Sequence, residues 1–383
     1  MEYFLSEQQK EIKKLARTIA EEKILPVRAQ LDEKEEFPRE ILKVLADADM
    51  FRVFVPEEYD GLGGGCLDLC LVVEELSRVC SAVAVSYAAV DLGIIPLKAY
   101  GTEEQKQKYL PDIASGKKLA AFAVTEPTAG SDVGAIKTTA KKVKGGYLLN
   151  GTKQFITNGG EADLYTVIVL TDKTKGPRGA SAILVEKDTP GFSFGRKEKK
   201  MGIRASATRE LIFEDCLVPE ENLIGKEGMG FLATMRLFDN SRPGIGAQAL
   251  GIAQGALEAA IDYARERIQF GHPIISIQAV QHMLADMAIQ VEAARALIYA
   301  AARTVDSGAK NVGAESAMSK VFASDTAMKV TTDAIQIFGG VGYMRDYPIE
   351  KMFRDAKITQ IYEGTNQVLR NAIAIELRKK KRL

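Results

Sequence analysis

The chain has 383 residues, of which 46% are hydrophobic and 27% are charged, as in an ordinary globular protein of two or three domains. Basic and acidic residues number 51 each, so no net charge favours binding to nucleic acid or to an anionic membrane. The N-terminus lacks the basic and apolar segments of a signal peptide, and we expect no uninterrupted apolar stretch of membrane-spanning length. These features predict a cytoplasmic protein with no nucleic-acid partner and no stable membrane insertion.

Residues 1–117 have a helical pattern. The segments Ser6–Gln9 and Thr102–Gln105 are capping boxes, each followed by a helical stretch. The glycine-rich segment 61–65 could pass for a dinucleotide-binding fingerprint, but no strand pattern precedes it, so a flexible loop is the better interpretation.

The apolar segment 81–97 contains one charged residue, Asp91. An aspartate is rarely buried without a partner. Two interpretations therefore remain open. The carboxylate turns to solvent at the break made by Gly93 and Pro96, or it serves a function inside an apolar pocket.

Residues 118–227 change to short β-prone runs separated by turns, which predicts an antiparallel β domain. The runs are residues 120–125, 147–150, 165–170, 182–185 and 209–213. Two polar loops lie among them, at residues 125–134 and 153–160. The first is rich in small and hydroxyl-bearing residues, which can offer N–H and O–H donors to a phosphate group.

From residue 228 onward the helical period returns, and four long segments predict a helix bundle. These segments are residues 229–266, 277–305, 316–338 and 367–378. The cysteines do not predict a disulfide framework in so long a chain. Cys66 and Cys70 could share a helix face, but His272 and His282 are distant in sequence, so we expect no metal site.

The segment from residue 336 to residue 367 carries the strongest chemical signal. A helix stops at Gly339-Gly340, where the absence of Cβ atoms lets the backbone pass close to a ligand. Glu363 then stands between Tyr362 and Gly364. Apolar surroundings would disfavour its charged form and suit it to general-base work. The alternative is a helix C-cap followed by an ordinary surface glutamate.

This segment resembles the C-terminal signature of the FAD-dependent acyl-CoA dehydrogenases, and the loop 125–134 resembles their N-terminal signature. The resemblance extends over essentially the whole chain. It implies an α+β fold with an N-terminal helical domain (1–117), a middle antiparallel β domain (118–227) and a C-terminal four-helix bundle (228–383). It also implies an oxidoreductase acting on CH–CH groups, which removes an α-proton and a β-hydride from an acyl-CoA with FAD as cofactor.

By the same resemblance, Glu363 is the base. A second base position known in the family aligns with Ser241, which cannot act as a carboxylate, so this chain is similar to the branch that uses the Tyr-Glu-Gly-Thr glutamate. Phe155 stands where many members carry Trp. The implied cofactor contacts are Phe122, Val124, Thr125, Ser131, Phe155, Ile156, Thr157, Arg267, Gln269, Phe270, Gln278, Gln336, Gly339, Gly340, Thr365 and Gln367; the implied substrate contacts are Ser131, Asp239, Arg242, Tyr362 and Gly364.

The resemblance further implies partners and a substrate class. The segment 267–278 matches one that reaches a neighbouring subunit's FAD, which implies a homotetramer, and electrons would pass to an electron-transferring flavoprotein. Enzymes of the family that act on alicyclic thioesters resemble this chain in carrying an aspartate in the helix that contains Asp91, but they lack the glutamate that stands here as Glu363. We therefore expect dehydrogenation of a short, branched or alicyclic acyl-CoA, with 1,4-dehydrogenation of cyclohex-1-ene-1-carboxyl-CoA by Asp91 as the alternative.

Three other classes fit the sequence less well. A non-catalytic flavin- or acyl-CoA-binding protein would have no reason to keep Glu363. An acyl-CoA oxidase, which passes electrons to oxygen, is usually longer. A nicotinamide dehydrogenase needs a strand–glycine loop–helix unit, which is not found.

Overall fold

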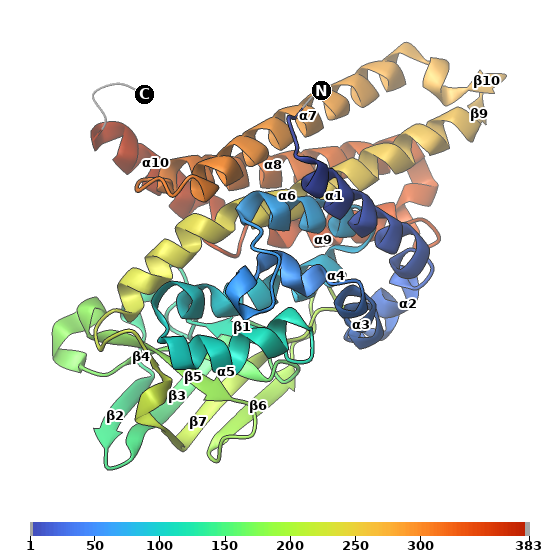
Figure 1. Ribbon diagram of the computed structural model, residues 1–383. Helices are drawn as coiled ribbons and strands as arrows, with labels where there is room; N and C mark the ends of the chain where they lie inside the picture. Colours follow the sequence, from blue (N-terminus) through green and yellow to red (C-terminus); the bar gives the residue numbers. More distant parts are fainter. Residues whose placement is uncertain (1–2, 380–383) are drawn as a thin grey trace.

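The computed structural model describes residues 3–379, which form a helical part, a β-sheet and a second helical part in chain order (Figure 1). The first part begins with a capping box, as predicted. Ser6 Oγ accepts from Gln9 N at 3.1 Å, and Gln9 Oε1 accepts from Ser6 N at 3.1 Å. Its helical elements are α1 (Glu7–Ile19), η1 (Ala20–Ile24), α2 (Arg28–Lys34), α3 (Arg39–Asp47), η2 (Met50–Phe54), η3 (Glu57–Tyr59), α4 (Cys66–Tyr100) and α5 (Glu103–Ala114).

Helix α4 is the buried centre of this part. It has 35 residues, and its path changes direction at Cys80, whose backbone angles (φ −153°, ψ 101°) are not helical. Contrary to the expectation from sequence, α4 is long and apolar enough to cross a membrane. Most of its apolar segment is buried inside the protein, however, and packing against α6, α1 and β1 accounts for its apolar composition.

The second part is a mixed sheet rather than a purely antiparallel one. Its strands are β1 (Ala120–Ala123), β2 (Thr139–Val143), β3 (Gly146–Thr157), β4 (Leu164–Leu170), β5 (Ala180–Glu186), β6 (Phe192–Lys197), β7 (Thr208–Val218) and β8 (Leu223–Ile224), in the order β6-β7-β3-β2-β4-β5-β8. β1 pairs with β4 in parallel. A parallel pair needs a long connection, which residues 124–163 supply by way of the β2–β3 hairpin.

The third part contains the predicted long helices and a small hairpin. Its elements are α6 (Gly230–Glu266), β9 (Ile268–Gln269), β10 (His272–Pro273), α7 (Gln278–Asp306), α8 (Gly313–Phe338), α9 (Ile349–Ile358) and α10 (Asn366–Lys379). At 1.5 Å per residue, α6 is about 55 Å long. It runs from the sheet to the β9–β10 hairpin, which projects from the far end of the bundle (Figure 1).

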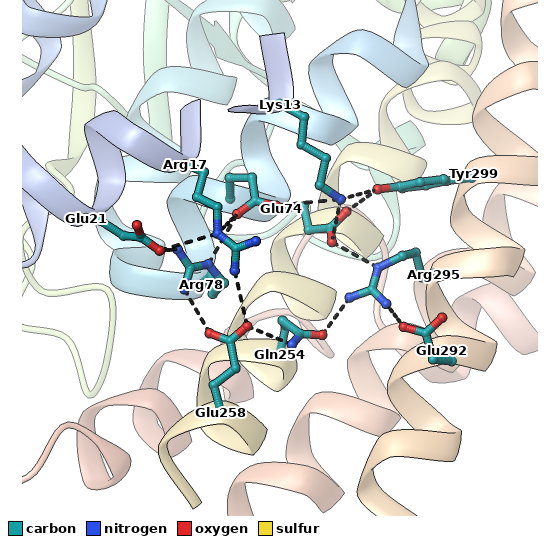
Figure 2. A network of polar contacts seen from close by, with 11 residues as sticks. Lys13, Arg17, Glu21, Glu74, Arg78, Gln254, Glu258, Glu292, Arg295 and Tyr299 are labelled. Carbon is teal, nitrogen blue, oxygen red and sulfur yellow. Dashed lines mark hydrogen bonds and ion pairs between the residues drawn. The ribbon is translucent and has the colours of Figure 1, made fainter. Parts of the chain in front are cut away.

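A network of charged side chains joins α1, α4, α6 and α7 (Figure 2). At its centre, the buried carboxylate of Glu74 accepts hydrogen bonds from Lys13 (3.2 Å), Arg295 (3.0 Å) and Tyr299 (2.5 Å). Burial alone would raise the pKa of Glu74, but the charges of Lys13 and Arg295 and these hydrogen bonds outweigh it and lower that pKa. The pKa of the adjacent Glu75 is raised, chiefly by burial. Two neighbouring buried glutamates therefore contribute to stability with opposite signs.

We expect Glu74→Gln to lower the free energy of unfolding at neutral pH by about 3 kcal/mol, because it removes the buried carboxylate that Lys13 and Arg295 share. A lowered carboxyl pKa stabilises the fold above the unfolded-state pKa, and this stabilisation is lost as pH falls through the folded-state value. Urea unfolding at neutral and acidic pH measures both effects. Glu75→Gln is the matched control, since a raised carboxyl pKa opposes folding at neutral pH. A loss in Glu75→Gln equal to that in Glu74→Gln would contradict this account.

Candidate active site

Glu363 lies in the loop between α9 and α10, where two consecutive residues have left-handed backbone. Its φ is +55° and that of Gly364 is +95°. Glutamate rarely adopts this conformation, so the surrounding contacts must hold it. Ser241 Oγ, on α6, donates a hydrogen bond to Glu363 Oε2 at 2.8 Å, and the side chain is partly buried. Glu363 is therefore held against α6 and does not extend into solvent.

The electrostatic surroundings of Glu363 fit a general base. Burial raises the pKa of its carboxyl group, whereas the Ser241 hydrogen bond and the charges of Arg242 and Lys320 act in the opposite direction, and the net shift is upward. A carboxylate with a raised pKa accepts a proton more readily near neutral pH. Among the described residues, the backbone N–H of Glu363 has no hydrogen-bond partner, so it is free to donate to a ligand oxygen.

Side chains on α6 connect Glu363 to the sheet. Arg242 Nη1 donates to Asp239 Oδ1 at 2.8 Å, and its guanidinium lies 6.0 Å from the centroid of the Phe238 ring. Phe238 in turn meets Phe122, on β1, edge to face at 6.3 Å. The predicted residues Phe122, Asp239, Arg242 and Glu363 therefore form one contiguous group.

Tyr362 and Gly364, which flank the carboxylate, are anchored to different helices. The Tyr362 hydroxyl donates to Gln248 Oε1 on α6, and Gln248 Nε2 donates to Ser81 Oγ on α4 at 2.7 Å. The Gly364 carbonyl accepts from Lys320 Nζ on α8 at 2.8 Å. Three helices thus determine the conformation of this loop.

The two polar loops of the β-sheet, residues 125–134 and 153–160, lie side by side, so they can contact one ligand together. Gln154 N donates to the Thr125 carbonyl at 2.8 Å. Lys153 Nζ, fully buried, donates to the Val124 carbonyl at 3.0 Å and to Glu126 Oε1 at 2.7 Å. Burial lowers the pKa of Lys153 to about 8, although Glu126 opposes the shift. This buried ion pair joins the end of β1 to β3.

Several residues predicted to bind FAD have the open surroundings that a bound cofactor needs. A Cβ atom added to Gly339 or Gly340 would meet no atom within 4 Å, so the backbone there is open to close approach. Phe155 has a left-handed φ of +59° and a side chain that is 58% exposed. An apolar ring held outward at a strained position fits a surface that a flat, partly apolar group covers. The described residues therefore fit FAD.

The structure divides the predicted cofactor residues into two groups. One lies near the sheet and the Glu363 loop. It comprises Phe122, Val124, Thr125, Ser131, Phe155, Ile156, Thr157, Thr365 and Gln367. The other lies at the far end of α6, on the hairpin (Arg267, Gln269, Phe270), at Gln278 and at the end of α8 (Gln336, Gly339, Gly340), where Phe338 stacks on Tyr263 at 4.2 Å. From Phe238 to Tyr263 is about 35–40 Å along the helix, too far for one cofactor to touch both groups within a chain.

Asp91 does not fit the first sequence-based interpretation. It is buried, 6% exposed, so it does not turn to solvent. It is paired, because Lys98 Nζ, two helical turns further along α4, lies 2.6 Å from Asp91 Oδ1 and also donates to the Phe54 carbonyl. This ion pair compensates the buried charge, so burial alone does not require a catalytic role for Asp91.

The cysteines have no metal-binding arrangement in the part of the chain that the structure describes. All four are free. The pKa of Cys70 is raised well above its usual value by a hydrogen bond with Cys66 and by burial, which disfavours the thiolate that a metal would bind. Within residues 3–379, no group of three or more His, Cys, Asp or Glu side chains could hold a metal ion.

Sequence reasoning missed the residues that support Glu363 and the sheet loops. Lys320, Lys153, Glu126 and Gln248 are all buried polar side chains near the predicted site. Lys320 does leave a signal, since it interrupts the apolar stripe of a predicted helix with a charge, a pattern that requires a buried partner.

Family models match the three parts of the chain. The N-terminal, middle and C-terminal domains of acyl-CoA dehydrogenase match residues 6–117, 121–216 and 228–377. An acyl-CoA dehydrogenase of Bacillus subtilis is 48% identical over 371 residues, which are 97% of this chain and 98% of that protein. Enzymes of this family depend on FAD in general.

Two solved structures are similar over nearly the full length. Butyryl-CoA dehydrogenase from Megasphaera elsdenii is 44% identical with a TM-score of 0.96, covering 99% of this chain and all of the other. A chain solved in work on the electron-transferring flavoprotein of Acidaminococcus fermentans and flavin-based electron bifurcation is 50% identical with a TM-score of 0.97, at the same coverage. The chain therefore belongs to the acyl-CoA dehydrogenase family of oxidoreductases.

Proposed function

We propose that this enzyme dehydrogenates a short-chain acyl-CoA such as butyryl-CoA to the 2-enoyl-CoA, with Glu363 as the base and FAD as the cofactor. The observation that carries the proposal is the placement of Glu363. It is a partly buried carboxylate with a raised pKa, held in a left-handed turn beside α6, and α6 contacts β1 through Phe238 and Phe122.

The chain supplies positioning and electrostatic stabilisation. The free N–H of Glu363 donates to the thioester carbonyl oxygen and so stabilises the enolate that develops when the α-proton leaves. Glu363 accepts that proton, and bound FAD would supply the hydride acceptor for the β-hydrogen. The loops joined by Lys153 and Glu126 hold Phe155 and Thr157 at the proposed cofactor face, and the ring of Phe238 lies beside the Arg242 guanidinium.

The short-chain assignment draws support from the similarity to a butyryl-CoA dehydrogenase. An alicyclic substrate has no such support among the relatives described above, and the Asp91–Lys98 ion pair leaves no unpaired carboxylate for the 1,4-dehydrogenation. The proposal therefore assigns no role in catalysis to Asp91.

The purified enzyme tests this assignment directly. It should show flavin absorption bands, and anaerobic butyryl-CoA should bleach them much faster than cyclohexanecarboxyl-CoA or cyclohex-1-ene-1-carboxyl-CoA does. Faster bleaching by a cyclic thioester would overturn the short-chain assignment. A preparation that holds no flavin, and takes none up from added FAD, would overturn the proposed function itself.

We also propose an electron-transferring flavoprotein as the electron acceptor, which the similarity to the chain from the Acidaminococcus work supports. Stopped-flow mixing of the substrate-reduced enzyme with a purified electron-transferring flavoprotein measures the transfer. We expect this transfer to be faster than reoxidation by air. Rapid turnover with oxygen alone would instead indicate an oxidase.

The separation of the cofactor residues along α6 supports a homotetramer in which each FAD lies between two subunits. Phe270, at the hairpin tip, is 90% exposed, and Ile268 beside it is 58% exposed. Apolar side chains so placed fit a surface that a neighbouring subunit covers.

Mixed assemblies test the sharing of FAD. We expect Glu363→Gln and Arg267→Glu chains to be inactive as separate assemblies, and co-expression of the two to restore part of the activity. In a mixed pair, an intact Glu363 from one chain meets an intact hairpin from the other. Static light scattering should give four chain masses for the wild type. A monomer that retains one FAD per chain would contradict the proposal.

A further inference from the structure

The left-handed backbone at Glu363 must be held by contacts with neighbouring residues. Glycine tolerates the φ of +95° at Gly364, but a glutamate with a φ of +55° persists only where the surroundings over-determine it. Ser241 holds the carboxylate, and Gln248 holds Tyr362, the residue before it. The peptide after Glu363 is held by Lys320, whose Nζ lies 2.8 Å from the Gly364 carbonyl oxygen.

Lys320 is one of several α8 side chains that form hydrogen bonds with this loop. Its Nζ also donates to Asn366 Oδ1 at 3.0 Å. Asn366 Nδ2 donates to Ser324 Oγ at 2.9 Å and lies 2.8 Å from Asp325 Oδ1. Asp325 also accepts from Gln360 Nε2 at 2.6 Å, so α8 contacts the chain on both sides of Glu363.

A lysine is an unexpected choice for holding two neutral oxygen atoms. Lys320 is 0% exposed, and its ammonium bonds a carbonyl and an amide, which a neutral donor could satisfy equally well. None of the described carboxylates forms an ion pair with it within 4 Å. Burying a charge in this way is costly unless the charge has a use.

The charges near Lys320 indicate what its buried positive charge does. Arg242 on α6 and Lys320 on α8 both act on Glu363 and oppose the rise in its pKa that burial causes. Arg242 already has a carboxylate partner in Asp239, whereas Lys320 forms no ion pair within 4 Å in residues 3–379. Burial lowers the pKa of Lys320 to about 7, with Glu363 and Asp325 opposing the shift and Arg242 adding to it.

We propose that Lys320 is a positioning residue that fixes the left-handed turn at Glu363 and Gly364, and that its positive charge keeps the Glu363 carboxylate ionised before proton abstraction. This inference rests on the proposed function, because it assigns Lys320 a role through the base. It predicts two separable effects of Lys320 variants: a slower proton abstraction from lost alignment, and a change in pH dependence from the lost charge.

Exchange of the α-protons isolates the step in which the base acts. A butyryl-CoA analogue with sulfur in place of C3 has no β-hydrogen to lose, so the FAD-loaded enzyme can remove and return its α-proton without reducing the flavin. The rate of deuterium incorporation from D2O, followed by NMR across pH, therefore reports on Glu363 alone. Binding of the analogue is measured separately by calorimetry.

The variants separate alignment from charge. Lys320→Met removes donors and charge at similar volume, and we expect about 10- to 100-fold slower exchange with unchanged binding of the analogue. Lys320→Gln retains an N–H donor but no charge, so its exchange should be faster than that of Lys320→Met. In both variants the acidic limb of the pH profile should move to higher pH, because the pKa of Glu363 rises when Lys320 no longer lowers it.

Matched controls decide between the possible outcomes. Ser324→Ala, one turn along α8, loosens Asn366 without changing a charge and should leave the acidic limb in place. Lys329→Met removes an exposed lysine from the same helix and should change neither rate nor limb. Slower exchange with an unmoved limb in both Lys320 variants would overturn the electrostatic role, and wild-type exchange in both would overturn the whole inference. Exchange at the wild-type rate in Glu363→Gln would instead refute the proposed function. If Lys320→Met does not fold, Lys320→Gln still tests the inference.

Discussion

Replacing Glu363 with glutamine is expected to leave FAD bound and to slow flavin reduction by saturating butyryl-CoA at least about 10³-fold, because the general base is lost. The amide preserves the volume of the side chain and can still accept the Ser241 hydrogen bond, so the left-handed turn should persist. Anaerobic stopped-flow measurement of the flavin absorbance gives the rate. Reduction at the wild-type rate would show that another group removes the α-proton.

Ser241→Ala is the matched control for this prediction. It keeps the base but removes a hydrogen bond that lowers the pKa of Glu363. The acidic limb of its rate profile should therefore move to higher pH, whereas the rate on the plateau should fall far less than in Glu363→Gln. Equal losses in the two variants would indicate that the loop, rather than the carboxylate, had been disrupted.

Replacing Lys153 with methionine is expected to have the largest effect on stability, lowering the free energy of unfolding by about 3–5 kcal/mol. The substitution strands Glu126, which is 5% exposed, as an unpaired buried carboxylate. Glu126 would keep only its hydrogen bonds from the backbone N–H groups of Lys137 (2.6 Å) and Thr138 (3.0 Å). Urea unfolding of the apoprotein measures the loss separately from cofactor binding.

The same variant should bind FAD more weakly, because Lys153 joins the end of β1 to the strand that carries Phe155. Adding Glu126→Gln to Lys153→Met removes the stranded charge, and the single amide oxygen can still accept one of the two backbone N–H groups. We expect the double variant to recover part of the lost stability but not the affinity for FAD. A single variant as stable as the wild type would show that the ion pair does not hold the sheet loops.

The periodic segments of this chain could be predicted from sequence because their patterns arise from local chemistry. The capping box at Ser6–Gln9, the long helix α6 and the loop position of Glu363 all follow from residue spacing and are confirmed. Short strands without an apolar pattern were missed, namely β2, β6 and β8, because partner strands rather than their own sequences stabilise them.

The burial and pairing of single side chains were decided only by the tertiary structure. Asp91 looked unpaired in its apolar segment, but Lys98, two helical turns later on α4, forms an ion pair with it and also donates to the Phe54 carbonyl. The parallel pairing of β1 with β4 was equally hidden, since alternation of apolar residues does not encode strand direction.

The base itself was identified by sequence, but its environment was not. A glutamate between an aromatic residue and a glycine indicated the reacting group, because only a residue type and its neighbours were needed. The hydrogen bond from Ser241 to Glu363 joins residues that are 122 positions apart in the sequence. The contact from Lys320 to the Gly364 carbonyl joins residues that are 44 positions apart. Such contacts depend on how α6 and α8 pack around the loop, and helix packing is set by the whole core rather than by any local segment.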